Sequence, residues 1–170
     1  MKYALLILAL VLTVTACQTM GQRTVTTQGD IPKTRTSGNP LADCTNTTTR
    51  RVVELANDAR DDEGLNELYC DRALARVAQR HAQDMCDHNY LSHTSRDGRT
   101  MVDRVDEAGI DYMALGENVA MGQRTPERVH TGWMDSEYHR ANILNDMFSR
   151  LGVGYVECGG QPYWVQVFAN

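Results

Sequence analysis

The spacing of apolar residues predicts two amphipathic helices at the start of the folded part of the chain. The first has Thr45–Asn46 as its cap, carries apolar residues at helical spacing over 52–59, and ends at Gly64. The second begins after Asp71, a favoured cap residue, and shows the strongest periodicity in the chain. Its apolar face consists of Leu74, Val77, Ala78, His81, Ala82 and Met85. Residues 65–69, between the two helices, are predicted to be extended.

The middle of the chain predicts shorter elements joined by loops. A loop over 87–99, with turn residues at Asp97–Gly98, leads into a short helix over 100–108. Residues 116–120 are predicted to form a buried strand. Thr125–Pro126–Glu127 shows the cap, first-position proline and first-turn acid that begin another helix. A further turn or two of helix is predicted over 136–144.

The end of the chain predicts a β-hairpin and, with it, the fold class. Strands over 152–158 and 163–168 flank a Gly159–Gly160 turn. The last strand is apolar on both faces except at Gln166, and such a strand needs cover on both faces. We therefore predict an α+β fold, a three-layer α-β-α sandwich with a central antiparallel sheet.

The first 16 residues have the features of a secretory signal peptide. Met1–Lys2 supplies a positive charge, and the apolar run over 3–14 is too short for a membrane span of about 20 residues. Small residues directly before Cys17 resemble the bacterial lipobox, in which Cys17 would be lipidated and become the mature N-terminus. The alternative is an ordinary signal peptide with an incidental cysteine. We predict an exported, membrane-anchored lipoprotein of the bacterial cell envelope.

A segment rich in small and polar residues follows Cys17. Residues 18–43 contain six Thr, three Gly and two Pro, and few large apolar residues. This composition predicts a flexible linker, the alternative being an ordered strand that docks on the domain. The predicted organisation is a signal peptide over 1–16, a lipidated N-terminus and linker over 17–43, and one folded domain over 44–170.

Composition indicates a single globular domain, and charge argues against a nucleic-acid-binding protein. A chain of 170 residues that is 42% hydrophobic and 23% charged fits one globular domain of ordinary size. The net charge of −5 argues against nucleic-acid binding through a broad basic surface, because such binding needs clustered positive charge. We therefore expect no nucleic-acid partner.

Four cysteines follow Cys17, and an even number in an exported chain predicts two disulfides. A continuous second helix would hold Cys70 and Cys86 about 24 Å apart, whereas a disulfide needs Cα atoms within about 7 Å. That pair is therefore excluded. The remaining pairings are Cys44–Cys86 with Cys70–Cys158, and Cys44–Cys70 with Cys86–Cys158. The first is preferred, because an antiparallel pair of the first two helices would bring Cys44 beside Cys86.

Three residues carry the chemistry of a metal site. His93 lies in the loop after the second helix, Glu117 in an otherwise apolar strand, and His139 shortly after the helix that contains Trp133. A lone buried carboxylate is costly, and two imidazoles beside it would complete a set suited to a divalent metal such as zinc. The alternative is a buried polar network that only fixes loop geometry. His81, on an apolar helix face, is interpreted as a hydrogen-bonded core residue.

Several motifs occur in a fixed order that is informative as a set. They are Gln79-x-His81-Ala82-x-Asp84-Met85, Ser92-His93-Thr94-Ser95-x-Asp97-Gly98, Gly116-Glu117-Asn118-Val119-Ala120, Gly132-Trp133-Met134-x-Ser136-x-x-His139-Arg140-Ala141-Asn142-Ile143-Leu144, Gly152-Val153-Gly154-Tyr155 and Tyr163-Trp164-Val165-Gln166-Val167-Phe168. This set resembles the CAP superfamily, or SCP domain (cysteine-rich secretory proteins, antigen 5, pathogenesis-related one), and most of all its bacterial branch. The resemblance covers 52–168 and implies an α-β-α sandwich.

The resemblance also implies a central cavity with a tetrad of two His and two Glu that binds divalent metal in several members. By motif, His93 and Glu117 match the first His and the first Glu, and His139 matches the second His. Glu137 stands where eukaryotic members often have the second Glu, whereas many bacterial members have Pro there. Because Glu137 is only two residues before His139, its membership of the metal site stays open.

The function we predict is that of a non-enzymatic extracytoplasmic binding or interaction module. Neither G-x-S-x-G nor H-E-x-x-H occurs. A hydrolase of cell-wall or protein substrates, in which Glu117 activates a metal-bound water, is the alternative. A purely structural spacer would leave the polar residues unexplained. The expected cofactor is Zn²⁺ or another divalent cation, and the expected partners are a membrane, through the lipid anchor, and a lipid, cell-wall or protein ligand.

Overall fold

The computed structural model describes residues 41, 44 and 46–170, which all lie in one compact unit. The predicted signal peptide, the predicted lipidation site Cys17 and nearly all of the predicted linker lie outside these residues. Within the described part of the chain, no helix has the length and apolar character needed to cross a membrane.

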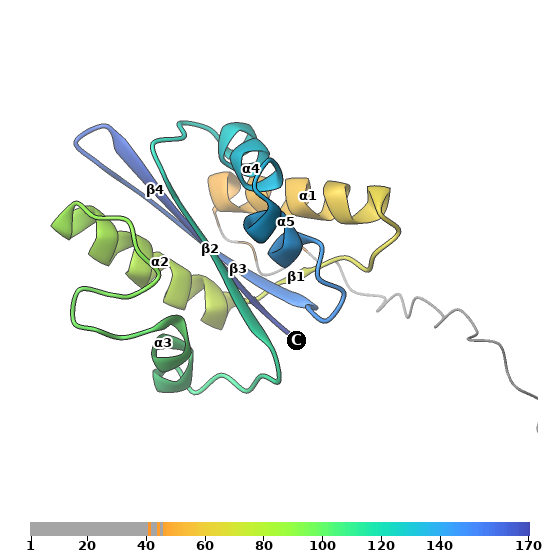
Figure 1. Cartoon of the computed structure of the whole chain (residues 1–170), viewed down its shortest axis with the longest axis horizontal. Coiled ribbons are helices and arrows are strands. Elements are labelled where there is room, and N and C mark those ends of the chain that lie inside the picture. The colour runs from red at the N-terminus through yellow and green to blue at the C-terminus, as the bar shows by residue number, and fades with distance from the viewer. Residues whose placement is uncertain (1–40, 42–43, 45) are drawn as a thin grey trace, which may run out of the picture. The chain divides into compact units, whose positions relative to one another are not determined.

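The domain has three layers, with a four-stranded sheet between helices (Figure 1). The elements in chain order are α1 (Thr47–Asp62), β1 (Tyr69–Cys70), α2 (Arg72–His88), α3 (Met101–Glu107), β2 (Leu115–Met121), α4 (Pro126–Met134), α5 (Glu137–Ile143), β3 (Arg150–Cys158) and β4 (Gln161–Ala169). The helices α2 and α3 cover one face of the sheet, and α1, α4 and α5 cover the other. The predicted α-β-α sandwich is confirmed.

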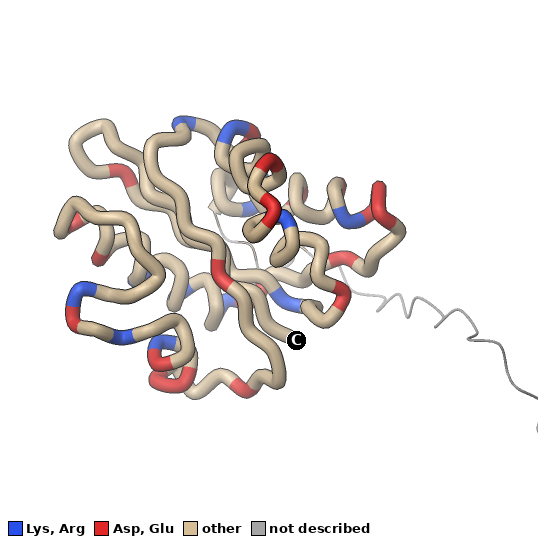
Figure 2. Tube along the Cα trace, viewed as in Figure 1, with Lys and Arg blue, Asp and Glu red and all other residues tan. Residues whose placement is uncertain are grey.

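The strand order is β1-β3-β4-β2. The three long strands pair antiparallel, as predicted, but the two-residue β1 runs parallel to β3, so that the sheet is mixed. β4 lies between β3 and β2, which explains why it is apolar on both faces. Charged residues lie mainly on the helices and loops (Figure 2).

The close approach of α2 to the sheet depends on two glycines in β3. A Cβ atom at Gly152 would meet the backbone of Leu74 and Ala75, and one at Gly154 would meet the backbone of Ala78. All six residues of the predicted apolar face of α2 are buried. The helix therefore seats its backbone directly on the strand, which fixes the position of the loop that follows it.

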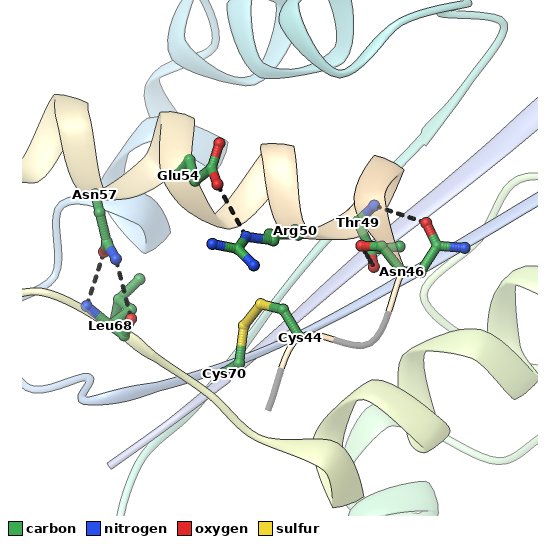
Figure 3. The surroundings of a disulfide bond; sticks show 8 residues. All are labelled: Cys44, Asn46, Thr49, Arg50, Glu54, Asn57, Leu68 and Cys70. Carbon is green, nitrogen blue, oxygen red and sulfur yellow. Dashed lines mark hydrogen bonds and ion pairs between the residues drawn. A yellow bond between two sulfur atoms is a disulfide. The ribbon is translucent and has the colours of Figure 1, made fainter. Parts of the chain in front are cut away.

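Two disulfides close the domain, and the preferred connectivity is wrong. Cys44 pairs with Cys70 at a Cα–Cα distance of 5.5 Å (Figure 3), and Cys86 pairs with Cys158 at 5.8 Å. The pairing of Cys44 with Cys86 fails because α1 and α2 lie on opposite faces of the sheet instead of side by side. The exclusion of Cys70–Cys86 is confirmed, since α2 runs without a break between these cysteines.

The guanidinium of Arg60 ties α1 to the end of α5. Its side chain is fully buried, and Nε donates to the carbonyl oxygen of Asn66 at 2.7 Å. Nη1 donates to the carbonyl oxygens of Ile143 and Asn145 at 2.9 and 2.8 Å, and Nη2 to that of Phe148 at 3.3 Å. Because these carbonyls end α5 and begin the next loop, Arg60 fixes where α5 lies beside β2.

Candidate functional site

Glu117 occupies the middle of β2, the edge strand of the sheet, and its side chain is only 3% exposed. Its two carboxylate oxygens have different partners. Oε1 accepts a hydrogen bond from Nδ1 of His93 at 2.9 Å, and Oε2 accepts one from Nη2 of Arg104 at 2.6 Å. The buried charge is thus compensated by a guanidinium that the sequence analysis did not identify.

Arg104 also holds the loop that carries His93. From α3, its Nη1 donates to the carbonyl oxygen of His93 at 3.1 Å, to Oγ of Ser95 at 2.9 Å and to the carbonyl oxygen of Arg99 at 3.1 Å. The residue itself is 5% exposed. No motif includes Arg104, and a single arginine in a predicted short helix gives no sign in the sequence that it is buried.

His81 belongs to the core beneath this loop, as predicted. It is 1% exposed, and its Nε2 donates to the carbonyl oxygen of Ser92 at 2.8 Å, so that this nitrogen carries the proton. Its Nδ1 lies 3.3 Å from Oγ of Ser95. Burial lowers the pKa of His81, which favours the neutral ring. His81 therefore supports the loop from below.

The ring of His93 is oriented by Glu117 and open to solvent on its other side. A carboxylate can only accept, so Nδ1 of His93 carries a proton and the neutral ring has its lone pair on Nε2. The side chain is 58% exposed. The hydrogen bond to Glu117 raises the pKa of His93 above its usual value of 6.5, although partial burial opposes this. A carboxylate behind a histidine in this way is the usual support of a metal-binding imidazole.

His139 comes to the same edge of the sheet from α5, on the opposite layer. Asn118 of β2 donates from Nδ2 to the carbonyl oxygen of His139 at 3.1 Å. The amide of Asn118 is itself held by Gln166 at 3.0 Å and Asn142 at 2.9 Å. Burial lowers the pKa of His139, and the nearby charge of His93 lowers it further. The ring of His139 is partly buried at this edge.

Glu137 lies apart from this group. Residues two positions apart on a helix point about 200° away from each other, so Glu137 and His139 occupy opposite sides of α5. Glu137 is exposed and lines a separate open groove with Glu63, Arg140 and Leu144. The structure thus brings His93 and Glu117 into contact, places the backbone of His139 against the neighbouring Asn118, and leaves Glu137 outside.

The donor set that remains consists of two imidazoles. In the described part of the chain, no three His, Cys, Asp or Glu side chains are grouped so as to hold a metal ion on their own. Glu117 is already bonded through both oxygens. Two neutral imidazoles fit a divalent cation and would leave its other positions to water or to a further ligand.

The three-layer sandwich is the fold of a known class of protein, the CAP or SCP domain. The CAP family model, "Cysteine-rich secretory protein family", matches residues 53–168, and the chain belongs to this family.

Known proteins agree with this assignment. The chain is 44% identical over 137 residues to YkwD of Bacillus subtilis (strain 168), which covers 75% of this chain and 52% of YkwD. The crystal structure of an extracellular SCP-domain protein from Bacillus anthracis superimposes with a TM-score of 0.68 at 33% identity, over 72% of this chain and 40% of that one. An outer surface protein from Borrelia burgdorferi superimposes with a TM-score of 0.66 at 22% identity, over 70% of this chain and 89% of that one. The chain thus spans about half the length of YkwD and less of the Bacillus anthracis protein.

Proposed function

We propose that this chain is an extracytoplasmic binding or interaction module that takes a divalent metal, with Zn²⁺ the first candidate, at His93 and His139. The observation that carries the proposal is the 2.9 Å contact between Nδ1 of His93 and Glu117. It supports the tautomer whose Nε2 lone pair is available to a metal. The lowered pKa of His139 favours a second neutral imidazole at neutral pH. Glu117 then supports His93 and is not itself a ligand.

The same contacts favour binding over catalysis. A hydrolase that activates water at this site needs a base that the water can reach. Both oxygens of Glu117 are bonded, one to His93 and one to Arg104, and the side chain is 3% exposed. Hydrolysis of cell-wall or protein substrates remains the second candidate. It predicts turnover of isolated cell wall or casein by the zinc-loaded protein, where the binding module predicts none.

Export of the domain belongs to the same proposal. The relatives include one protein described as extracellular and one described as an outer surface protein. Two disulfides in the domain fit an oxidising compartment outside the cytoplasm. The small residues before Cys17 then favour a lipid anchor on the mature N-terminus.

Calorimetric titration of the full chain with Zn²⁺ at pH 7.5 tests the metal proposal. His93→Ala and His139→Ala should each weaken zinc binding at least about tenfold, or about 1.4 kcal/mol. His88→Ala is the matched control, because His88 is exposed on α2 and bonded to Asp84, and it should leave the affinity unchanged. Wild-type affinity in both His93→Ala and His139→Ala would overturn the proposal.

A further inference from the structure

The opposite edge of the sheet carries a cavity that the proposed function does not use. It has a volume of about 260 Å³ and lies where α1, α2 and β3 meet, beside the Cys44–Cys70 disulfide drawn in Figure 3. We refer to it as the β3-edge cavity. Its apolar floor is formed chiefly by Val53, Leu151 and Val153. Its polar rim is formed chiefly by Arg72, Arg76 and Gln79.

The backbone of β3 is only partly covered along this cavity. The carbonyl oxygen of Leu151 accepts from the N–H of Asp71 at 3.0 Å, at the end of β1. Further along, the side-chain amide of Gln79 binds both the N–H and the C=O of Tyr155, each at 3.0 Å. Alternate residues of a strand present their N–H and C=O groups to the same side. The N–H and C=O of Val153 therefore face the same edge as those of Leu151 and Tyr155. Among the residues that the structure describes, none outside the sheet forms a backbone hydrogen bond with Val153.

The rim of the cavity favours an anion. The carboxylate of Asp71 accepts hydrogen bonds from the N–H groups of Ala73 and Leu74 in the first turn of α2. Its negative charge is compensated by an ion pair with Arg150 at 3.0 Å. Arg76 is exposed on α2, and no acidic residue in the described part of the chain forms an ion pair with it. A carboxylate placed in the cavity would therefore meet an unpaired guanidinium.

We propose that the β3-edge cavity binds the free carboxyl terminus of an extended peptide whose last side chain is apolar. The peptide main chain adds to β3 at Val153, the last side chain fills the floor over Leu151, and the carboxylate lies beside Arg76. Strand addition of this kind takes affinity from main-chain hydrogen bonds and specificity from a side-chain pocket.

A peptide fits this cavity better than an anionic amphiphile does. The volume of about 260 Å³ is just below the range of about 300–1,000 Å³ for drug-sized ligands, which suits a short apolar side chain more than a long acyl chain. The unpaired edge at Val153 offers a donor and an acceptor, and a peptide main chain satisfies both whereas an acyl chain satisfies neither.

Fluorescence anisotropy of the full chain, with both disulfides formed, tests the proposal. The probe is a fluorescein-labelled hexapeptide that ends in Ala-Val with a free carboxylate, compared with the same peptide as its terminal amide. Amidation and Arg76→Ala should each weaken binding about tenfold, because each removes one partner of a charge-assisted contact. Arg80→Ala is the matched control, since Arg80 is exposed one turn further along α2 and lines a different cavity, and it should change the affinity less than about twofold.

Three results would overturn the proposal: equal binding of acid and amide, equal losses in Arg76→Ala and Arg80→Ala, or no saturation below about 1 mM peptide. Displacement of the probe by decanoate at lower concentration than by the unlabelled peptide would assign the cavity to an amphiphile, which also overturns it. His93→Ala should bind the peptide as wild type does. A failure of the peptide proposal is therefore distinguishable from a failure of the metal proposal.

Discussion

Glu117 is the residue on which the candidate site depends. Its carboxylate joins a solvent-facing histidine to a buried arginine, and Arg104 extends the connection to the carbonyl oxygens of the His93 loop. The ion pair with Arg104 is almost fully buried, with side chains 5% and 3% exposed. Removal of one partner from such a pair leaves the other charge without compensation.

Glu117→Gln should therefore lower the free energy of unfolding by about 3–5 kcal/mol, because the buried guanidinium of Arg104 loses its counter-charge. The matched control is Glu107→Gln, which breaks the 2.7 Å ion pair of an exposed residue with Arg99 and should cost about 0–1 kcal/mol. Urea denaturation at pH 7.5 measures both. Similar decreases in the free energy of unfolding in the two variants would show that the buried Arg104–Glu117 pair contributes no more than an exposed ion pair does.

The pKa values of His93 and His139 should lie on opposite sides of the usual histidine pKa of 6.5. The pKa of His93 is raised, so the stability contributed by the His93–Glu117 pair is fully present below about pH 6.5 and is lost as the pH rises through the folded pKa. The pKa of His139 is lowered, so its protonation opposes folding as the pH falls from about 6.5 through its folded pKa.

NMR titration of the imidazole C–H signals tests this order, with His93 above 6.5 and His139 below it. Metal binding needs the His93 ring deprotonated at Nε2, so zinc affinity should begin to fall at a higher pH than for an isolated histidine. Glu117→Gln should move the His93 midpoint down toward its usual value. A His93 midpoint below that of His139 would contradict the geometry.

At the scale of elements, the packing of α2 on β3 determines where the His93 loop begins. The helix ends at His88, and its C-cap residue Asn89 has a left-handed conformation (φ 50°) that turns the chain into the loop. Gly152 and Gly154 allow the helix backbone to touch the strand, and real side chains at these positions have no space.

Gly154→Ala should destabilise the domain by about 1–3 kcal/mol or more, because the added methyl group meets the main chain of Ala78, which cannot move aside as a flexible side chain can. Gly132→Ala is the control. Gly132 lies inside α4, its nearest neighbour in that direction is Nε2 of Gln123 at 3.9 Å, and alanine there should stabilise by up to about 1 kcal/mol. Thermal unfolding of both variants measures the contrast, and a stable Gly154→Ala protein would refute this account of the α2–β3 contact.

The sequence predicts the helices and strands better than it predicts which of them pack or pair with one another. Asp71 and the apolar face after it predict α2 correctly, and Thr125–Pro126 predicts the start of α4, because caps and periodicity are local properties. The disulfide pairing depends on which face of the sheet each helix covers, and helical periodicity does not contain that information. For the same reason, the parallel pairing of Cys70 in β1 with β3 was not predicted.

At the scale of the whole molecule, the two edges of one sheet carry the two sites that we propose. The β2 edge has His93 and His139, which come from opposite layers, and the β3 edge has the cavity beside Arg76. Residue types and motifs indicated the three residues proposed for the first site, of which His93 and Glu117 are in contact. They did not indicate Arg104, because its importance arises only when α3 packs beside β2. Nothing local in the sequence marks the second site, since it is formed by three elements that meet in space.

The predicted membrane anchoring of the protein depends on Cys17. Lipidation predicts that the wild-type chain sediments with membranes and incorporates an alkyne-labelled fatty acid, since acyl chains bury their methylene groups in the bilayer. Cys17→Ser should appear in the soluble fraction without label. Equal membrane association of the two proteins would contradict the lipoprotein prediction and would leave the domain and its sites unaffected.

The most direct test of the central claim observes the imidazole nitrogens during zinc addition. Long-range proton–nitrogen NMR of the ¹⁵N-labelled full chain at pH 7.5 should show Nδ1 of His93 protonated before and after zinc, as its contact with Glu117 requires. Nε2 of His93 and one nitrogen of His139 should shift together with zinc, while both nitrogens of His81 stay unchanged. Loss of the proton from Nδ1 of His93, or a zinc response confined to other histidines, would contradict the account.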